Sequence, residues 1–393
     1  MANVNLTPSW ITKESIAILA EKLNFVRNIH DGFTGLFGDK SYNKGQSVQV
    51  RKPAQYKGRS GAALSVEDHV EQEVALVLAF QEGVDNQFSS LEMSYDLDSF
   101  SDRVLAPMMN TLADRVETKV LEAVGGFSVI NGSGASGEVV YRDYALAKAY
   151  LDNLAIESGN RCILIDTIMQ VEIIDQVKSF FQAPEQISKA YIEGSIGMNA
   201  GFNWYESSRI PLTATVATGN DVLTIGSISG NAIAVTAGGA SSVITKGTQY
   251  ALNANLVHPQ NKKALVGQVA HVTVLEDVTL DGTGAGTILV NADIVSSAAD
   301  ARQNVDAAPT TLTVVAQAKR KSLAFHKDAI TFAAPKLVTP EGTDKASVES
   351  IDNLSLRYIR DYDIQNDVFP ARFDIVFGTT VVRPEGIVTL IEG

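Results

Sequence analysis

Cysteine is nearly absent from this sequence: Cys162 is the only one among 393 residues. A single thiol excludes an internal disulfide and is typical of proteins that fold in a reducing compartment. Because Cys162 stands in the apolar run Cys162–Ile165, we expect a structural thiol in a buried strand. The sequence also lacks a run of about 18 apolar residues and a basic beginning followed by an apolar stretch. It therefore predicts neither a membrane span nor a signal peptide.

Residues with typical enzyme chemistry are scarce. The five histidines share no metal-ligand spacing with one another or with Cys162. Neither a nucleophile-elbow motif nor a phosphate-binding P-loop motif is present. The glycines of Gly132–Gly137 have the spacing of a dinucleotide-binding fingerprint, but the residues after them predict a strand where that fingerprint requires a helix. We therefore expect no enzymatic activity, no cofactor and no metal.

Basic residues are in deficit. Lysine and arginine number 32 against 45 aspartates and glutamates, and the net charge is −13. This balance argues against a dedicated nucleic-acid binder, which would carry a basic stripe. It does not argue against a protein that encloses nucleic acid without binding it tightly.

One central segment lacks aromatic residues and charge. Between Thr213 and Ala318 the only aromatic residue is Tyr250, and 11 of the 106 residues are charged. The remainder is rich in threonine, valine, alanine and glycine, in short alternating phrases that predict β-strands. The flanking segments are helical and charged before it and mixed after it. The pattern predicts a small all-β domain, residues 213–320, inserted into a larger α+β domain.

Two helices are predicted from apolar residues at helical spacing. The first lies within residues 1–30, and two interpretations stay open for it: a helix packed on its own domain, or an arm that reaches a partner. The second covers residues 97–124 and gives the strongest helical signal of the chain. Pro107 interrupts that pattern, so we expect either a kink or a helix that begins near Pro107.

Residues 31–85 predict exposed β structure. Ser47–Arg51 alternates as a strand, and Glu73–Phe80 is typical of a return strand. The residues between them form a polar and basic loop. A hairpin this long usually needs a neighbour to lie on, and the alternative is an ordinary solvated loop.

Several phrases carry a resemblance to one family, in the order Glu82–Phe88, Ala113–Val120, Ala200–Phe202, Arg209–Pro211, Phe325–Ile330 and Val382–Ile387. With the position of the insertion, the chain resembles the major capsid (coat) proteins of tailed double-stranded-DNA bacteriophages, which have the Hong Kong 97-type fold. It is most similar to the coat-protein branch of the Salmonella short-tailed phages, which carries an inserted β-domain.

The resemblance implies an α+β fold with a division of the chain into six parts. They are an N-terminal arm (1–39), an extended loop (40–80), a peripheral domain with the spine helix (81–130), a first part of the axial domain (131–212), the inserted β-barrel-like domain (213–320), and a second part of the axial domain with return strands (321–393). A cross-link between lysine and asparagine is not implied, because this branch does not use that chemistry.

The resemblance also implies a function and partners. Copies would assemble into hexamers and pentamers of an icosahedral shell that encloses double-stranded DNA without sequence-specific binding. A scaffolding protein, a portal protein at one vertex and a decoration protein are the implied partners, with assembly in the cytoplasm of the host bacterium. Two alternatives stay open: the shell of a cargo-enclosing bacterial nanocompartment, and a binding module of a phage surface or tail.

Charged residues in the exposed segments are the candidate assembly contacts. They lie in the first helix, in the basic loop, at a hairpin tip of the insertion and near the last strand. The nine candidates are Glu14, Glu21, Arg51, Lys52, Lys57, Arg59, Asp281, Arg383 and Glu385.

Overall fold

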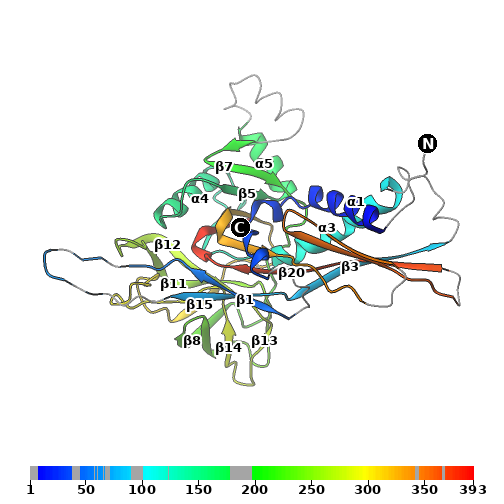
Figure 1. Ribbon diagram of the computed structural model, residues 1–393. Helices are drawn as coiled ribbons and strands as arrows, with labels where there is room; N and C mark the ends of the chain where they lie inside the picture. The colour runs from blue at the N-terminus through cyan, green and yellow to red at the C-terminus, as the bar shows by residue number, and fades with distance from the viewer. Residues whose placement is uncertain are drawn as a thin grey trace. The chain divides into compact units, whose positions relative to one another are not determined.

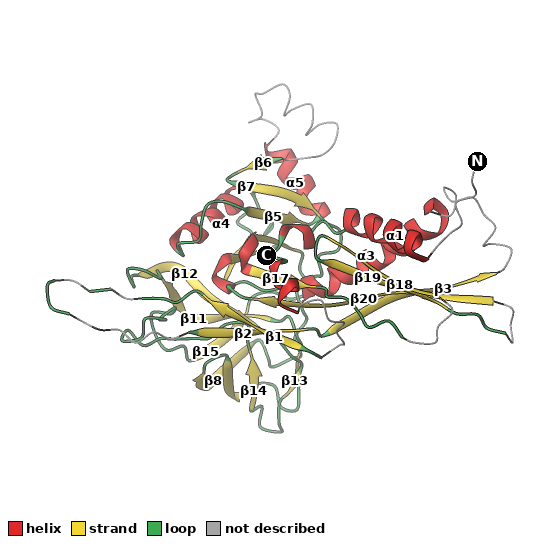
Figure 2. Ribbon diagram, viewed as in Figure 1, coloured by secondary structure: helices red, strands yellow, loops and turns green. Residues whose placement is uncertain are grey.

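The computed structural model has helices and sheets in an α+β arrangement (Figure 2). It describes residues 8–37, 45–56, 58–59, 61–64, 66, 71–89, 101–122, 124–177, 197–340, 345–364 and 368–393. The chain forms two compact units, each built from three segments. Unit 1 comprises residues 1–50, 73–121 and 330–380, and unit 2 comprises residues 51–72, 122–329 and 381–393.

A five-stranded sheet forms the frame of unit 1 (Figure 1). Its strands are β3 (Phe80–Ser89), β17 (Ile330–Ala333), β18 (Lys345–Ile351), β19 (Leu354–Arg360) and β20 (Val368–Val381). The longest pairing joins β20 to β3 antiparallel, from Val368 opposite Ser89 to Phe377 opposite Phe80. Strands β18 and β19 form a hairpin whose turn residues, Asp352 and Asn353, have φ of 47° and 62°. Positive φ at both central residues suits the twist of a tight hairpin.

Helix α1 (Pro8–Lys22) lies on this sheet, packed against β18 and β19. Its apolar stripe is buried, with Ile16 and Leu19 fully inaccessible. The structure therefore shows the first helix packed within its own unit, which is one of the two interpretations that the sequence left open.

Helix α3 (Ala106–Glu122) begins beside Pro107 and follows a π-helical turn, Ser101–Leu105. Proline is tolerated in the first turn, where its missing N–H would have no helical partner. The expectation of a helix that begins near Pro107 is confirmed, and the apolar residues at four-residue spacing, such as Leu112 and Val116, are buried.

Glu117 departs from the sequence pattern. A charged residue in a helix normally faces water, yet Glu117 is fully buried. Its Oε1 accepts the main-chain N–H of Phe25 at 2.7 Å. A buried carboxylate is tolerated when it receives hydrogen bonds. Glu117 therefore fastens the segment after α1 to α3.

A mixed six-stranded sheet forms one half of unit 2. Its order is β4 (Ser128–Asn131), β21 (Ile387–Ile391), β16 (Lys321–His326), β5 (Arg161–Ile165), β7 (Phe202–Glu206) and β6 (Met198–Asn199). Helices α4 (Tyr141–Asn153) and α5 (Thr167–Val177) belong to the same half. Cys162 lies buried in β5, and burial raises the pKa of its thiol to about 11. A protonated, inaccessible thiol fits the structural role expected from the sequence.

The inserted segment forms a second six-stranded sheet in unit 2. Its order is β12 (Ala264–Thr273), β11 (Gln249–Val257), β15 (Thr311–Val314), β8 (Val222–Ser229), β9 (Ala232–Ala237) and β14 (Gly286–Leu289), with a separate pair of β10 (Val243–Ile244) and β13 (Val278–Thr279). A bridge between Val274 and Val290 joins the end of β12 to the end of β14. The main-chain bond from Leu275 N to Leu289 O, 2.9 Å, lies beside it. The two outer strands thus meet, which removes the exposed edges of an open sheet.

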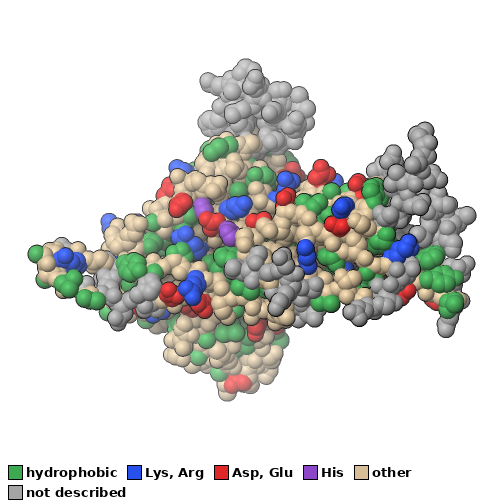
Figure 3. Space-filling view, in the orientation of Figure 1, with side chains coloured by type: hydrophobic (Ala, Val, Ile, Leu, Met, Phe, Trp, Pro, Cys, Tyr) green, Lys and Arg blue, Asp and Glu red, His purple; other side chains and the backbone are tan. Residues whose placement is uncertain are grey.

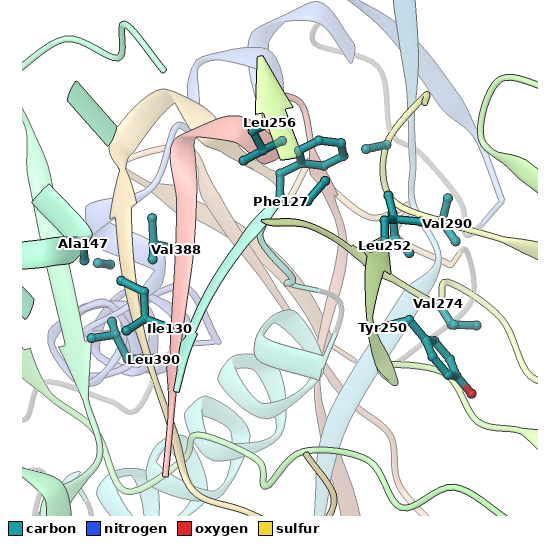
Figure 4. Packing of buried hydrophobic residues seen from close by; sticks show 14 of the residues in the cluster. Phe127, Ile130, Ala147, Tyr250, Leu252, Leu256, Val274, Val290, Val388 and Leu390 are labelled. Atoms are coloured by element: carbon teal, nitrogen blue, oxygen red, sulfur yellow. The ribbon is translucent and has the colours of Figure 1, made fainter. Parts of the chain in front are cut away.

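The barrel and the mixed sheet share one hydrophobic core (Figure 4). Figure 4 shows Phe127 together with the barrel residue Leu256, with the sheet residues Val388 and Leu390 on one side and the barrel residue Leu252 on the other. The chain enters and leaves the barrel through adjacent segments, where the N–H of Thr213 donates to the carbonyl of Lys319 at 2.9 Å. The inserted segment is therefore a continuation of the core of unit 2.

Candidate assembly surfaces

The basic loop leaves the short sheet of β1 (Ser47–Lys52) and β2 (Gln72–Val77) as a long, narrow extension (Figure 1). Its described residues include three exposed apolar side chains, Tyr56, Leu64 and Val66, of which Leu64 and Val66 are about four-fifths exposed (82% and 81%). In Figure 3 the end of this loop shows hydrophobic and basic side chains together. Apolar side chains gathered in water are typical of a contact surface.

The described arginines of the loop interact with residues of the loop itself. Arg51 Nη1 lies 3.5 Å from Glu71 Oε2 with both side chains largely exposed, a geometry that contributes little stability. The guanidinium of Arg59 donates to the carbonyls of Gly61 and Ala63, which bends the tip back on itself. Lys57 lies outside the described residues.

Three of the predicted contact residues come together at the root of the loop. Lys52, Arg383 and Glu385 line one cavity of about 220 Å³ in unit 2. Arg383 Nε lies 3.3 Å from Glu385 Oε1 across the short turn Pro384–Gly386. The sequence could not predict that these residues line one cavity, because more than 300 residues lie between Lys52 and Arg383.

The same cavity holds two residues that the sequence analysis missed. Gln72 Nε2, at the start of the return strand, donates to Asp293 Oδ2 at 3.3 Å. Asp293 belongs to the inserted segment, just beyond β14. No local motif marks either residue, since each gains its role only through the other.

The two acidic candidates of α1 have different surroundings. Glu14 is half-buried, and its Oε1 accepts the hydroxyl of Ser101 at 3.2 Å. Glu21 is exposed and lines a groove of about 510 Å³ between the end of α1 and the turn of the β18–β19 hairpin. Asp31 and Asp352 line the same groove together with Arg27, so three carboxylates against one guanidinium give it an acidic rim. Glu21 is thus the more exposed of the two acidic candidates.

Asp281 lies at the exposed tip between β13 and β14. Its Oδ1 accepts three hydrogen bonds from its own loop: the hydroxyl of Thr283 at 2.7 Å, the N–H of Thr283 at 2.8 Å and the N–H of Ala285 at 2.8 Å. These bonds, the hydroxyl of Thr283 first, hold the pKa of the Asp281 carboxyl below its usual range. Asp281 therefore shapes the tip in addition to carrying charge on it.

The glycine-rich loop Gly132–Gly137 uses its main-chain groups within the chain. The N–H of Gly132 donates to the carbonyl of Ile391, and the carbonyl of Gly137 accepts the N–H of Gly393, both at 2.8 Å. Helix α4 begins only at Tyr141, so no helix opens on these glycines. The loop closes the end of the mixed sheet, and the dinucleotide-binding geometry is not formed.

In the described part of the chain, none of the helices has both the length and the apolar character needed to cross a bilayer. Among the same residues, no three histidines, cysteines or carboxylates are grouped so that they could hold a metal ion.

Comparison with known proteins gives one family over most of the chain. A family model described as "P22 coat protein - gene protein 5" matches residues 36–393. No curated protein matches the chain. Among solved structures, it is similar to "Mycobacterium phage Che8", with 12% identity over 93% of this chain and 90% of that chain and a TM-score of 0.46. It is also similar to "Capsid structure of the Cyanophage P-SCSP1u", with 13% identity over 90% of this chain and 84% of that chain and a TM-score of 0.43. A third similar structure is "Crystal structure of virus-like particle from Pyrococcus furiosus", with 8% identity over 97% of this chain and 97% of that chain and a TM-score of 0.39.

Proposed function

The chain belongs to the P22 coat protein family and is a major capsid protein that forms a phage shell; on that premise we propose that one subunit joins the next mainly through its basic loop. One observation carries the proposal: Leu64 and Val66 are almost fully exposed on a loop that has no strand partner among the described residues. Burying a side chain of this size contributes about 1.5–3 kcal/mol. Every subunit of a shell repeats the contact, so a modest area per subunit suffices.

The proposal includes the organisation inferred from the resemblance. Subunits form hexamers and pentamers of an icosahedral lattice, and the six-part division of the chain describes each subunit. A scaffolding protein directs assembly in the bacterial cytoplasm, a portal protein takes one vertex, and a decoration protein is a further partner. The net charge of −13 supports retention of DNA by containment, because phosphate binding would need clustered lysine and arginine.

For the scaffolding contact, the acidic groove beside α1 is the stronger candidate surface. Glu21 is exposed there, with Asp31 and Asp352 adding negative charge to the same rim. A basic segment of the scaffolding protein fits this surface by charge complementarity. Glu14 is the weaker candidate, because its carboxylate already accepts a bond from Ser101.

A double substitution in the loop tests the proposal. Leu64→Ser with Val66→Ser should leave the free subunit as stable as the wild type, since neither side chain is buried, and should lower the yield of closed shells by about tenfold or more. Light scattering and electron microscopy of assembly reactions give the readout. Val222→Ser, which removes an exposed apolar residue of the barrel, is the matched control. Wild-type shell yields from the double variant would overturn the proposal.

A further inference from the structure

The loop root, which comprises Lys52–Gln55 and Gln72, lies against the inserted barrel. Residues 51–72 belong to the same compact unit as the barrel, although the strands that carry the loop continue into unit 1. On the loop side, the 220 Å³ cavity is lined by Lys52–Gln55 and Gln72. On the other side, it is lined by barrel residues that include Leu256, Val257, Asp293 and Asn304. The loop therefore has a second support besides the pairing of β1 with β2.

Asp293 is a rigid acceptor in this wall. Its main-chain carbonyl accepts Asn304 Nδ2 at 2.6 Å. Asn304 is fixed in turn, because its Oδ1 accepts the N–H of Val295 at 2.9 Å and its own N–H donates to Val295 O at 3.0 Å. The main chain that carries the Asp293 carboxylate is thus set by a network within the barrel, independent of the loop.

Charged residues line the cavity on both sides. Arg302 donates twice to Asp300, at 2.7 and 3.1 Å, and Arg383 lies against Glu385. Both arginines of the wall are therefore matched by carboxylates. Lys52 lines the cavity as the loop's cation, with the carboxylates of Asp293 and Glu385 lining it too.

From these contacts we propose that the inserted barrel positions the loop of its own subunit. Asp293 and the wall around it hold Gln72, so that the loop leaves the free subunit in a set direction before a second copy binds. A segment that is already ordered loses less conformational entropy on association. This consequence for assembly rests on the proposed function, whereas the holding of the loop root does not.

The test uses free, unassembled full-length subunits and the rate at which trypsin cleaves after Arg59. Asp293→Ala should free the loop root and speed cleavage by about threefold to tenfold, the effect of one lost hydrogen bond of ordinary strength. Asp293→Asn keeps an acceptor oxygen and should stay within about twofold of the wild type. Asp277→Ala, which removes a barrel carboxylate that does not line the cavity, should change nothing.

Equal cleavage rates for wild type and Asp293→Ala would overturn the inference. If Asp293→Ala also lowers the melting temperature, Gln72→Ala decides, because it removes the other partner and leaves the barrel intact: faster cleavage supports the inference and an unchanged rate overturns it. Assembly separates the two proposals. A freed loop in a subunit that still assembles at the wild-type rate supports the holding of the loop root and contradicts its consequence for assembly, whereas the loop contact itself is tested by Leu64→Ser with Val66→Ser.

Discussion

The main-chain N–H of His271 donates a 3.0 Å hydrogen bond to the carbonyl of Phe127. His271 lies in the barrel strand β12, and Phe127 precedes β4 of the mixed sheet, so the bond joins the inserted segment to the rest of unit 2. A second bond, from Asn291 Nδ2 to Gly125 O at 2.8 Å, lies in the same junction. The barrel is therefore fixed to the sheet by main-chain contacts as well as by the shared core.

Acid should weaken this junction through His271. Burial lowers the pKa of its imidazole to about 4, from an ordinary value of 6.5, although a backbone hydrogen bond at Val269 opposes the shift. Between pH 6.5 and about 4 the unfolded chain binds a proton that the folded chain does not. The free energy of unfolding should therefore fall over this window as pH falls, by on the order of 3 kcal/mol.

Urea denaturation of free subunits at pH 7.5, 6 and 5 measures this effect. His271→Gln removes the titrating group and should show a flatter loss of stability with falling pH. The prediction fails if the wild type and the variant lose stability in parallel.

Gly125→Ala should destabilise the same junction. A Cβ atom at Gly125 would lie 2.0 Å from Thr273 Oγ1, so either the strand or the threonine must shift. Overpacking of this kind costs about 1–3 kcal/mol, which thermal unfolding can detect. Gly159→Ala is the control, because a Cβ there meets nothing within 4 Å. Equal melting temperatures for the two variants would contradict the close approach.

Charge reversal should separate the two acidic residues of α1. Glu21→Lys should slow scaffolding-dependent assembly by about threefold to tenfold at low salt, and the effect should shrink as salt rises. Glu21→Gln should give a smaller effect of the same sign. Glu14→Lys should instead lower the stability of the free subunit, because it loses the bond from Ser101. Assembly kinetics that ignore Glu21→Lys at every salt concentration would remove the groove as the scaffolding contact.

Removal of the buried carboxylate of Glu117 should loosen the segment after α1. Glu117→Ala leaves the N–H of Phe25 without its acceptor, a loss of about 1–3 kcal/mol. Hydrogen exchange at Phe25 should rise more than exchange along β20. Glu117→Gln keeps an acceptor oxygen and should recover most of the protection. Unchanged exchange at Phe25 in Glu117→Ala would show that the bond is not the one that orders this segment.

Local sequence patterns were enough to predict much of the secondary structure. Apolar spacing placed α1 and α3, the chemistry of Pro107 placed the beginning of α3, and the apolar run around Cys162 placed the buried strand β5. Composition and short alternating phrases predicted the strands between Thr213 and Ala318, where β8 to β15 lie. Each of these features is decided by residues a few positions apart, which is the range over which a sequence pattern has physical meaning.

The remainder depends on contacts between distant residues. Glu117 can be buried because its carboxylate accepts the N–H of Phe25. Phe25 lies 92 residues away in the sequence, so the periodicity of the helix could not predict this contact. The meeting of Gln72 with Asp293 spans 221 residues. Among the candidate contacts, exposure was predictable for the loop, but the surroundings of Glu14 were not, because Ser101 approaches it only in the folded unit.

The most direct test of shell formation through the loop is negative-stain electron microscopy of the purified products. The full chain and a variant lacking residues 52–62 are each expressed with and without the scaffolding protein of the phage. We predict uniform closed shells from the full chain with scaffolding protein, and folded, unassembled subunits from the deletion variant. Uniform closed shells from the deletion variant would contradict the account of the loop. Only monomers or small discrete oligomers from the full chain under both conditions would contradict shell assembly from this chain and its scaffolding protein.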